Sequence, residues 1–105
     1  MRAANHAAFA VALLATGCAS TNEVALAGGP NWTRTTPKSP DAFQECMTLT
    51  GDWGYFNLNS SPLDEGRMLW MTQGAFIRVD QSGSGATTAY YGFNRYLERV
   101  ALDCL

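Results

Sequence analysis

The chain has few of the residue types from which active sites are built, and each shortage excludes a class of function. His6 is its only histidine, and it lies near the N-terminus. Charged residues make up 15% of the 105 residues. Lysine and arginine do not cluster, which argues against nucleic-acid binding because phosphate neutralisation supplies most of that affinity. The longest apolar run falls short of the ~20 residues that a membrane-spanning helix needs.

The N-terminus has the pattern of an export signal. One positive charge, Arg2, precedes an apolar segment from about Ala7 to Ala15, and small residues lead to Cys18. Residues 15–18 (Ala-Thr-Gly-Cys) resemble the lipobox of bacterial lipoproteins, with alanine in place of the commoner leucine. The resemblance implies that residues 1–17 are a signal peptide and that Cys18 becomes a lipid-modified first residue. The alternative is an ordinary secretory signal cut after Ala19.

A lipid anchor would place this protein in the cell envelope without a protein span. Several acyl chains on Cys18 hold a protein firmly, because each buried methylene contributes ~0.8 kcal/mol. Ala19, next to the cysteine, is similar to the residues that sort lipoproteins to the outer membrane. We therefore expect attachment to the outer membrane, facing the periplasm or the cell surface.

Cleavage of the signal would also remove His6. The remaining chain would have no imidazole for acid-base chemistry or metal binding, and six basic residues against nine acidic ones, a net charge of −3. Asp64 and Glu65 are adjacent carboxylates, which we interpret as solvated loop residues. No nucleophile has an identifiable activator. We therefore expect a protein that is not an enzyme and that has no cofactor and no metal site.

The other two cysteines predict a disulfide bond. With Cys18 lipidated, Cys46 and Cys104 form a pair in an exported chain, where the surroundings are oxidising. A bond between them closes a loop of about 58 residues, which the chain-entropy model values at roughly 4 kcal/mol. That contribution is large for a domain of this size.

The composition divides the exported chain into two parts. Residues 18–42 contain Gly28, Gly29 and Pro30, then Pro37 and Pro40, among small polar residues, and are predicted to be the lipidated cysteine followed by a flexible tether. Residues 43–105 are predicted to form a small disulfide-bonded β domain.

Alternation of apolar and polar residues indicates strands in this domain. The clearest predicted strand is Met47–Tyr55, and Asn57–Gly66 is predicted to be a loop. The further predicted strands are Arg67–Met71, Ala75–Asp80 and Ala86–Phe93, with a turn at Gln81–Gly85. The expected fold is mainly β, a small antiparallel sheet of three to four strands that is closed by the disulfide.

The last segment fits two patterns. Leu97, Val100, Ala101 and Cys104 recur at helical spacing behind Asn94 as an N-cap, whereas Tyr96, Val100, Leu102 and Cys104 fit one face of a strand. The pattern slightly favours a C-terminal helix.

Two further resemblances imply alternative functions. Leu49-Thr50-Gly51-Asp52-Trp53 is similar to the first-strand motif of lipocalins, which implies small-ligand binding in an eight-stranded barrel, although about 60 residues are too few for one. Ser84-Gly85 resembles the start of the Ser-Gly-x-x-Tyr loop of lipid-anchored lysozyme inhibitors, with Thr88 at the tyrosine position and Tyr90 two residues later. The second resemblance implies inhibition of a lysozyme-type hydrolase.

The aromatic residues support a binding function. One sheet face of this length cannot bury all of them, because neighbouring residues such as Tyr90 and Tyr91 face opposite sides of a strand. We expect an aromatic surface that binds a protein or another envelope component, and the candidate residues are Trp53, Trp70, Tyr90 and Tyr91. The alternative is that the C-terminal segment forms a second layer over them. The other aromatic residues in question are Tyr55, Phe93 and Tyr96.

Overall fold

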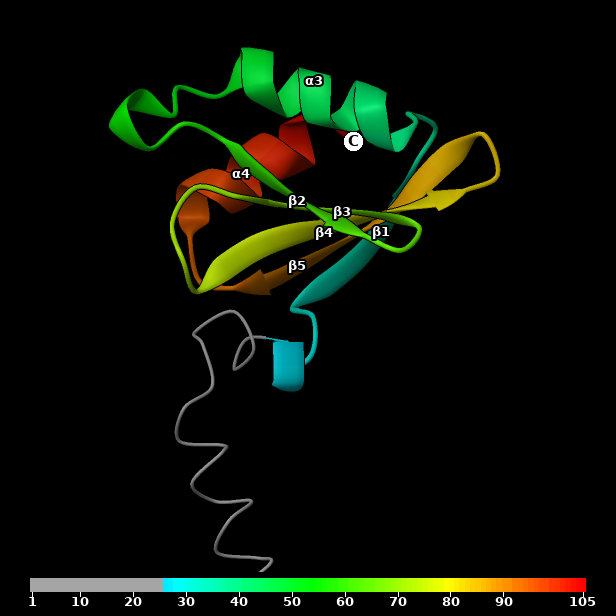
Figure 1. Ribbon diagram of the computed structural model, residues 1–105, viewed down its shortest axis with the longest axis horizontal. Coiled ribbons are helices and arrows are strands. Elements are labelled where there is room, and N and C mark those ends of the chain that lie inside the picture. The colour runs from blue at the N-terminus through cyan, green and yellow to red at the C-terminus, as the bar shows by residue number, and fades with distance from the viewer. Residues whose placement is uncertain (1–25) are drawn as a thin grey trace, which may run out of the picture.

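The computed structural model describes residues 26–105, in which an antiparallel sheet carries two helices on one face (Figure 1). The strand order is β1-β5-β4-β3-β2. The strands are β1 (Trp32–Thr36), β2 (Asn59–Leu63), β3 (Gly66–Trp70), β4 (Ala75–Ser82) and β5 (Gly85–Gly92). The helices are α3 (Pro40–Thr50) and α4 (Arg95–Asp103), and a short 3₁₀ turn, η1 (Gly54–Phe56), follows α3.

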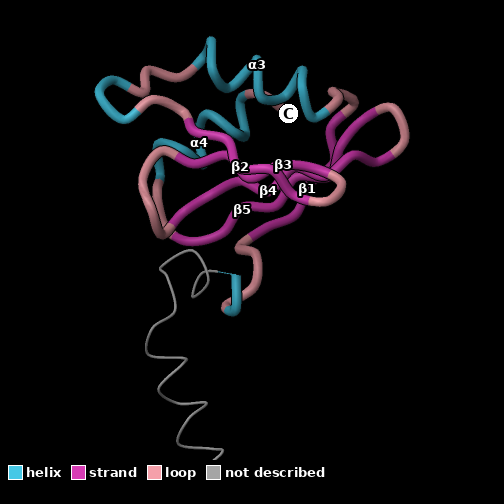
Figure 2. Tube along the Cα trace, in the orientation of Figure 1, coloured by secondary structure: helices cyan, strands magenta, loops and turns pink. Residues whose placement is uncertain are grey.

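The predicted fold class is confirmed, with five strands in place of three or four. Figure 2 shows the sheet as one layer and the helices as the other. The predicted signal peptide, residues 1–17, and the predicted lipidation site, Cys18, lie outside the described residues.

The β4–β5 hairpin lies at the centre of the sheet. It can lie there because buried apolar side chains alternate along its strands. Ile77 and Val79 point to the helices and are fully buried, and Tyr90 lies opposite Ile77 in the register of the two strands. Gly83 supplies the positive φ that the tight turn needs. The strands predicted at Arg67–Met71, Ala75–Asp80 and Ala86–Phe93 are confirmed as β3, β4 and β5.

The strand predicted at Met47–Tyr55 is wrong, because residues 40–50 form α3. Ser39 caps the helix, its Oγ accepting a hydrogen bond from the Ala42 N–H at 3.2 Å, and Pro40 follows at the first helical position. Phe43 and Met47, one turn apart, are fully buried, while Leu49 is 77% exposed. An alternating strand would have placed Met47 and Leu49 on the same face.

The flexible tether predicted to residue 42 is wrong from Trp32 onward. Residues 32–36 form β1, an edge strand that pairs with β5 along its whole length. Trp32 stacks on Tyr90 with ring centroids 5.8 Å apart, and its Nε1–H donates to Glu98 at 2.9 Å. The folded domain therefore begins before the predicted boundary at residue 43, since cross-strand pairing outweighs the glycine-rich and proline-rich composition on either side.

The loop predicted at Asn57–Gly66 contains the other edge strand, β2. It pairs with β3, so that Ser60 lies opposite Leu69 and Pro62 lies opposite Arg67. An edge position tolerates proline because one side of the strand needs no ladder hydrogen bonds. Polar residues and a proline concealed this strand from pattern analysis.

The C-terminal helix and the disulfide are confirmed. Asn94 caps α4, its Oδ1 accepting a hydrogen bond from the Leu97 N–H at 3.1 Å. Leu97, Val100 and Ala101 are buried against the sheet. Cys104 bonds to Cys46, with their Cα atoms 5.8 Å apart, and so links α4 to α3.

The contrast between Met47 and Leu49 tests the helix directly. We expect Met47→Ala to lower the free energy of unfolding by about 2–5 kcal/mol, because it leaves a cavity beneath α3. Leu49→Ala should change it by less than about 0.5 kcal/mol, because Leu49 faces solvent. Urea unfolding of the two variants measures both values, and similar large losses in both would contradict the helix.

The disulfide should contribute strongly to stability. Reduction, or the Cys46→Ala and Cys104→Ala double variant, is expected to lower the free energy of unfolding by about 2–4 kcal/mol, since the open chain gains entropy when unfolded. Urea unfolding with and without reductant measures the difference in the parent chain. The double variant is the control, and its transition should not respond to reductant.

Candidate functional site

The four aromatic residues predicted to form a binding surface do not form one. Trp53 and Tyr90 belong to the core under the helices, and Tyr91 is buried on the other side of the sheet, where it stacks on Phe76 at 4.8 Å. Trp70 is half-buried, and its Nε1–H donates to Ser61 Oγ at 3.2 Å. The expectation that Tyr90 and Tyr91 face opposite sides is confirmed, but neither is exposed.

The second layer made by the C-terminal segment explains part of this burial. α4 packs over β4 and covers Tyr90, whose hydroxyl accepts a hydrogen bond from the Asn94 N–H at the start of that helix. Burial raises the pKa of the Tyr90 hydroxyl above its ordinary value. The hydroxyl is thus a neutral structural group and not a surface contact.

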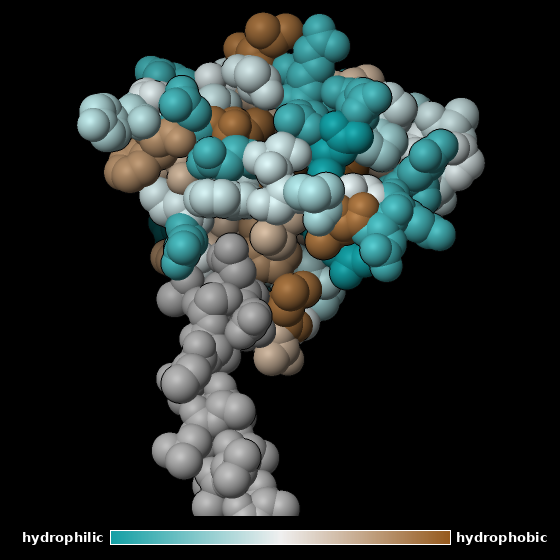
Figure 3. All heavy atoms as spheres, viewed as in Figure 1, coloured by the Kyte–Doolittle hydropathy of each residue, from teal (hydrophilic) through white to brown (hydrophobic). Residues whose placement is uncertain are grey.

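Other aromatic rings are exposed at one end of the domain. Tyr55 is 96% exposed, Phe56 is 55% exposed and Phe93 is 81% exposed. Tyr55 and Phe56 lie in η1, and Phe93 lies in the link from β5 to α4; both segments are at the left end of the molecule in Figure 1. We call Tyr55, Phe56 and Phe93 the aromatic end. Apolar surface is visible beside η1 in the space-filling view (Figure 3).

Local hydrogen bonds hold η1 in place. Trp53 is the buried anchor: its Nε1–H donates to the Met47 carbonyl at 3.1 Å, and its ring meets the Tyr96 ring edge-on at 5.6 Å. The Asp52 N–H donates to Tyr96 Oη at 2.6 Å, and Asp52 Oδ1 accepts from the Gly54 N–H at 3.2 Å. The exposed rings are therefore presented by a turn that is fixed to both helices.

Two residues with positive φ shape the same turn. Gly54 has φ +55° and Asn57 has φ +56°, and a positive φ is least costly for glycine. Phe93 has similar neighbours, Gly92 at φ +89° and the helix cap Asn94. Aromatic residues between glycine and asparagine are thus the sequence signal that marks exposed rings here. That signal singles out Phe56, which pattern analysis did not include among the candidates.

A pocket of about 550 Å³ lies at the aromatic end. Rings and a thioether form most of its wall, and a single carboxylate, that of Asp52, lies among them. The lining residues are Asp52, Trp53, Gly54, Tyr55, Phe56, Met71 and Tyr96. This pocket is a wide apolar depression that is open to solvent.

Two guanidinium groups lie over aromatic rings of this region, one over Tyr96 of the pocket lining and one over Phe93, which does not line the pocket. Arg99 Cζ lies 5.2 Å from the centroid of the Tyr96 ring, and Arg95 Cζ lies 5.9 Å from that of Phe93. Both arginines are exposed, and neither takes part in an ion pair within residues 26–105. Exposed arginines therefore lie beside these rings, together with the carboxylates of Asp52, Glu98 and Asp103.

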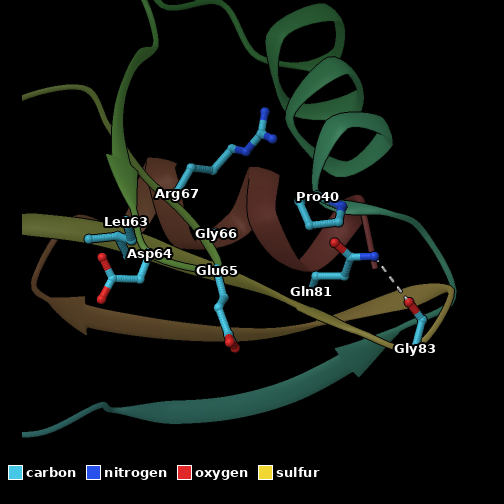
Figure 4. Close-up of a pocket in the computed structure, with 8 residues that line it drawn as sticks. All are labelled: Pro40, Leu63, Asp64, Glu65, Gly66, Arg67, Gln81 and Gly83. Carbon is cyan, nitrogen blue, oxygen red and sulfur yellow. Dashed lines mark hydrogen bonds between the residues drawn. The ribbon is translucent and has the colours of Figure 1, made fainter.

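A second cavity, of about 630 Å³, is polar and opens between the β2–β3 turn, the β4–β5 hairpin and the start of α3. In Figure 4 the side chains of Asp64 and Glu65 point in different directions, and Arg67 points toward α3. Arg67 contacts Asp41 at 2.6 Å and Gln44 at 2.7 Å. The two carboxylates and the guanidinium thus do not converge on a common point.

The described part of the chain contains no histidine, and no group of three or more histidine, cysteine or acidic residues there could hold a metal ion. None of its helices is long and apolar enough to cross a membrane.

Comparison with known proteins finds no matching family model, no matching curated protein and no matching solved structure.

The structure shows where the lipocalin-like and the inhibitor-like segments lie in the fold. The lipocalin-like motif ends α3 and enters the turn before η1, and the sheet of the described residues is open, so the barrel that this resemblance implies is not formed. Ser84 lies in the β4–β5 turn, and Thr88 and Tyr90 lie buried in β5. The inhibitor-like segment therefore presents no exposed tyrosine.

Proposed function

We propose that this chain is a lipid-anchored, non-catalytic envelope protein whose folded domain binds a protein partner through the aromatic end. The observation that carries the proposal is the exposure of Tyr55, Phe56 and Phe93 at one end of the domain, where they are three of the six exposed large hydrophobic residues of residues 26–105. Burying an aromatic ring of this size contributes about 1.5–3 kcal/mol, so three rings can supply much of a binding energy. Aromatic residues, methionine and arginine are also the types that are enriched in protein interfaces.

The rigidity of η1 supports the same function. Surface rings on a fixed turn lose little conformational entropy on binding, because their positions are set before the partner arrives. Trp53, Tyr96 and Asp52 provide that fixation through the contacts described above. A turn that only had to connect α3 to β2 would need neither exposed rings nor this framework.

The anchor part of the proposal is supported by the lipobox-like sequence that ends at Cys18. Because β1 begins at Trp32, 14 residues after Cys18, the connection between them spans at most about 50 Å even when fully extended. A lipidated Cys18 would thus keep the domain close to the membrane surface. A partner in or near that membrane fits this position best.

Fatty-acid labelling tests the anchor. The parent chain, expressed in a bacterial host with lipoprotein processing, should incorporate labelled palmitate, because only a diacylglyceryl-modified cysteine acquires it by this route. Cys18→Ala should abolish the label, and the double variant at Cys46 and Cys104 is the control that should keep it. Label that persists in Cys18→Ala would contradict lipidation at this residue.

Site-specific photo-crosslinking tests the binding surface. A photoreactive phenylalanine analogue in place of Tyr55 should produce a discrete crosslinked species in intact cells, because this ring is expected to lie in the interface. The same analogue in place of Leu49, an exposed apolar residue on α3, is the matched control and should produce none. Mass spectrometry of the adduct identifies the partner.

Equal crosslinking from positions 55 and 49 would contradict a defined interface at the aromatic end. The Phe93→Ala variant adds a second check, because it should weaken the adduct from position 55 without changing the thermal unfolding midpoint. A residue that is 81% exposed contributes little to stability.

A further inference from the structure

Two opposite charges lie near the same ring at this end of the domain. The Asp52 N–H donates to Tyr96 Oη at 2.6 Å, and Arg99 Cζ lies 5.2 Å from the centroid of the Tyr96 ring. Asp52 and Arg99 are both exposed, and within residues 26–105 neither forms an ion pair with the other or with a third residue. Each copy of the domain thus presents a carboxylate and a guanidinium that lack an ionic partner in the described part of the chain.

The presence of both signs limits the class of partner. Asp52 lies in the pocket lining, and Glu98 and Asp103 lie on the same helix as Arg95 and Arg99. These groups offer no excess of positive charge to an acidic segment and no uniform negative charge to a basic one. Under two-fold symmetry, however, the carboxylate of one copy can face the guanidinium of the other, because residue i then contacts residue j and residue j contacts residue i.

The apolar part of the surface fits the same symmetry. Tyr55 is 96% exposed and lines the wide apolar depression that is open to solvent. A two-fold axis brings the same patch of two copies together, so that the Tyr55 ring of each copy can cover the open side of the other depression. The second copy would therefore close a depression that the described part of one chain leaves open.

The position of the aromatic end allows two anchored copies to meet. Figure 1 shows the start of the described chain below the sheet, on the side away from the helices, and η1 at the left end. A two-fold axis that runs from the sheet toward the helices joins two such ends and leaves both chain starts pointing in the same direction. Both copies can thus be attached to one membrane while they are in contact.

Resting on the function proposed above, we propose that the partner of the aromatic end is a second copy of this chain. The two copies meet about a two-fold axis, and the Tyr55 ring of each covers the depression of the other. Asp52 of each copy pairs with Arg99 of the other. The ring contacts supply most of the binding energy, and the two symmetric ion pairs fix the relative position of the copies.

The size of this interface makes it depend on the anchor. An aromatic side chain buries ~150–250 Å², so the exposed parts of Tyr55, Phe56 and Phe93 amount to roughly 400 Å² per copy. Two copies together approach only the lower end of the ~1,200–2,000 Å² that specific interfaces bury. Attachment to one membrane raises the effective concentration of the copies, which a contact of this size needs.

Crosslinking between two distinguishable copies tests the identity of the partner. Intact cells express the parent chain with one epitope tag, together with a chain that has a second tag and the photoreactive phenylalanine analogue in place of Tyr55. The adduct should carry both tags, because the ring at position 55 is expected to contact the other copy. The same analogue in place of Leu49 is the matched control and should give at least about tenfold less of the two-tag adduct.

Exchange of the charges tests how the copies are paired. When both copies carry Asp52→Arg, or both carry Arg99→Asp, the two-tag adduct should fall at least about tenfold, because like charges then face each other. Co-expression of an Asp52→Arg chain with an Arg99→Asp chain should restore the adduct, since each ion pair re-forms with its signs exchanged. Glu45→Arg, which reverses an exposed charge on α3, is the matched control and should leave the adduct at the parent level.

Thermal unfolding of each variant shows whether it is folded. If a reversed charge unfolds the domain, Asp52→Asn and Arg99→Gln repeat the test by removing the charges, and each should lower the adduct severalfold.

The other outcomes decide against the proposal. An adduct from position 55 that contains a different protein and no second copy overturns the self-association but leaves the proposed function. Two-tag adducts of equal yield from positions 55 and 49 overturn a defined contact between copies. Unchanged adducts in the folded charge variants, or no restoration in the mixed pair, overturn the pairing of Asp52 with Arg99. Absence of any adduct from position 55 removes the proposed function as well.

Discussion

The packing of α3 and α4 side by side on one face of the sheet is the constraint on which the rest of the domain depends. The two helices are short, at 11 and 9 residues, and neither would persist alone in water. Phe43 and Met47 from α3 and Leu97 and Val100 from α4 share one core with the sheet. The Cys46–Cys104 bond joins the helices where Cys104 is fully buried, so that unfolding of one helix must disturb the other.

The aromatic end follows from this packing. α3 ends at Thr50, and the chain turns at Gly51, where a Cβ would lie only 2.5 Å from the Trp53 ring. Glycine therefore lets Trp53 fold back beneath the end of α3 and meet Tyr96 of α4. With its anchor in the core, the next turn has no buried position for its own rings, and Tyr55 and Phe56 project outward. Tyr55 and Phe56 are thus exposed because Trp53, the residue before η1, is buried.

The elements that could be predicted from the sequence are those whose pattern is strictly local. The β4–β5 hairpin has an alternating run on each side of a glycine-rich turn, and α4 has an asparagine cap before apolar residues at helical spacing. The Met47–Tyr55 segment shows that a local pattern can predict the wrong element. Its alternating apolar residues belong to the end of α3 and to the turn that follows. The stronger signals, the Ser39-Pro40 start and Phe43 one turn before Met47, lie upstream of the predicted strand or at its first residue.

The sequence by itself determined the antiparallel β class and the absence of histidine from residues 26–105, because composition and short-range periodicity are enough for each. The pairing of Cys46 with Cys104 was predicted from the sequence only together with the lipobox resemblance that assigns Cys18 to lipid. Only the tertiary structure decided which aromatic rings are buried and which are exposed. Trp53, Tyr90, Tyr55 and Phe93 are all large aromatic residues, and their exposure depends on whether a helix, a strand or solvent lies over each one. Edge strands β1 and β2 were likewise decided by pairing with distant partners, since polar segments form strands only when a neighbouring strand supplies the hydrogen bonds.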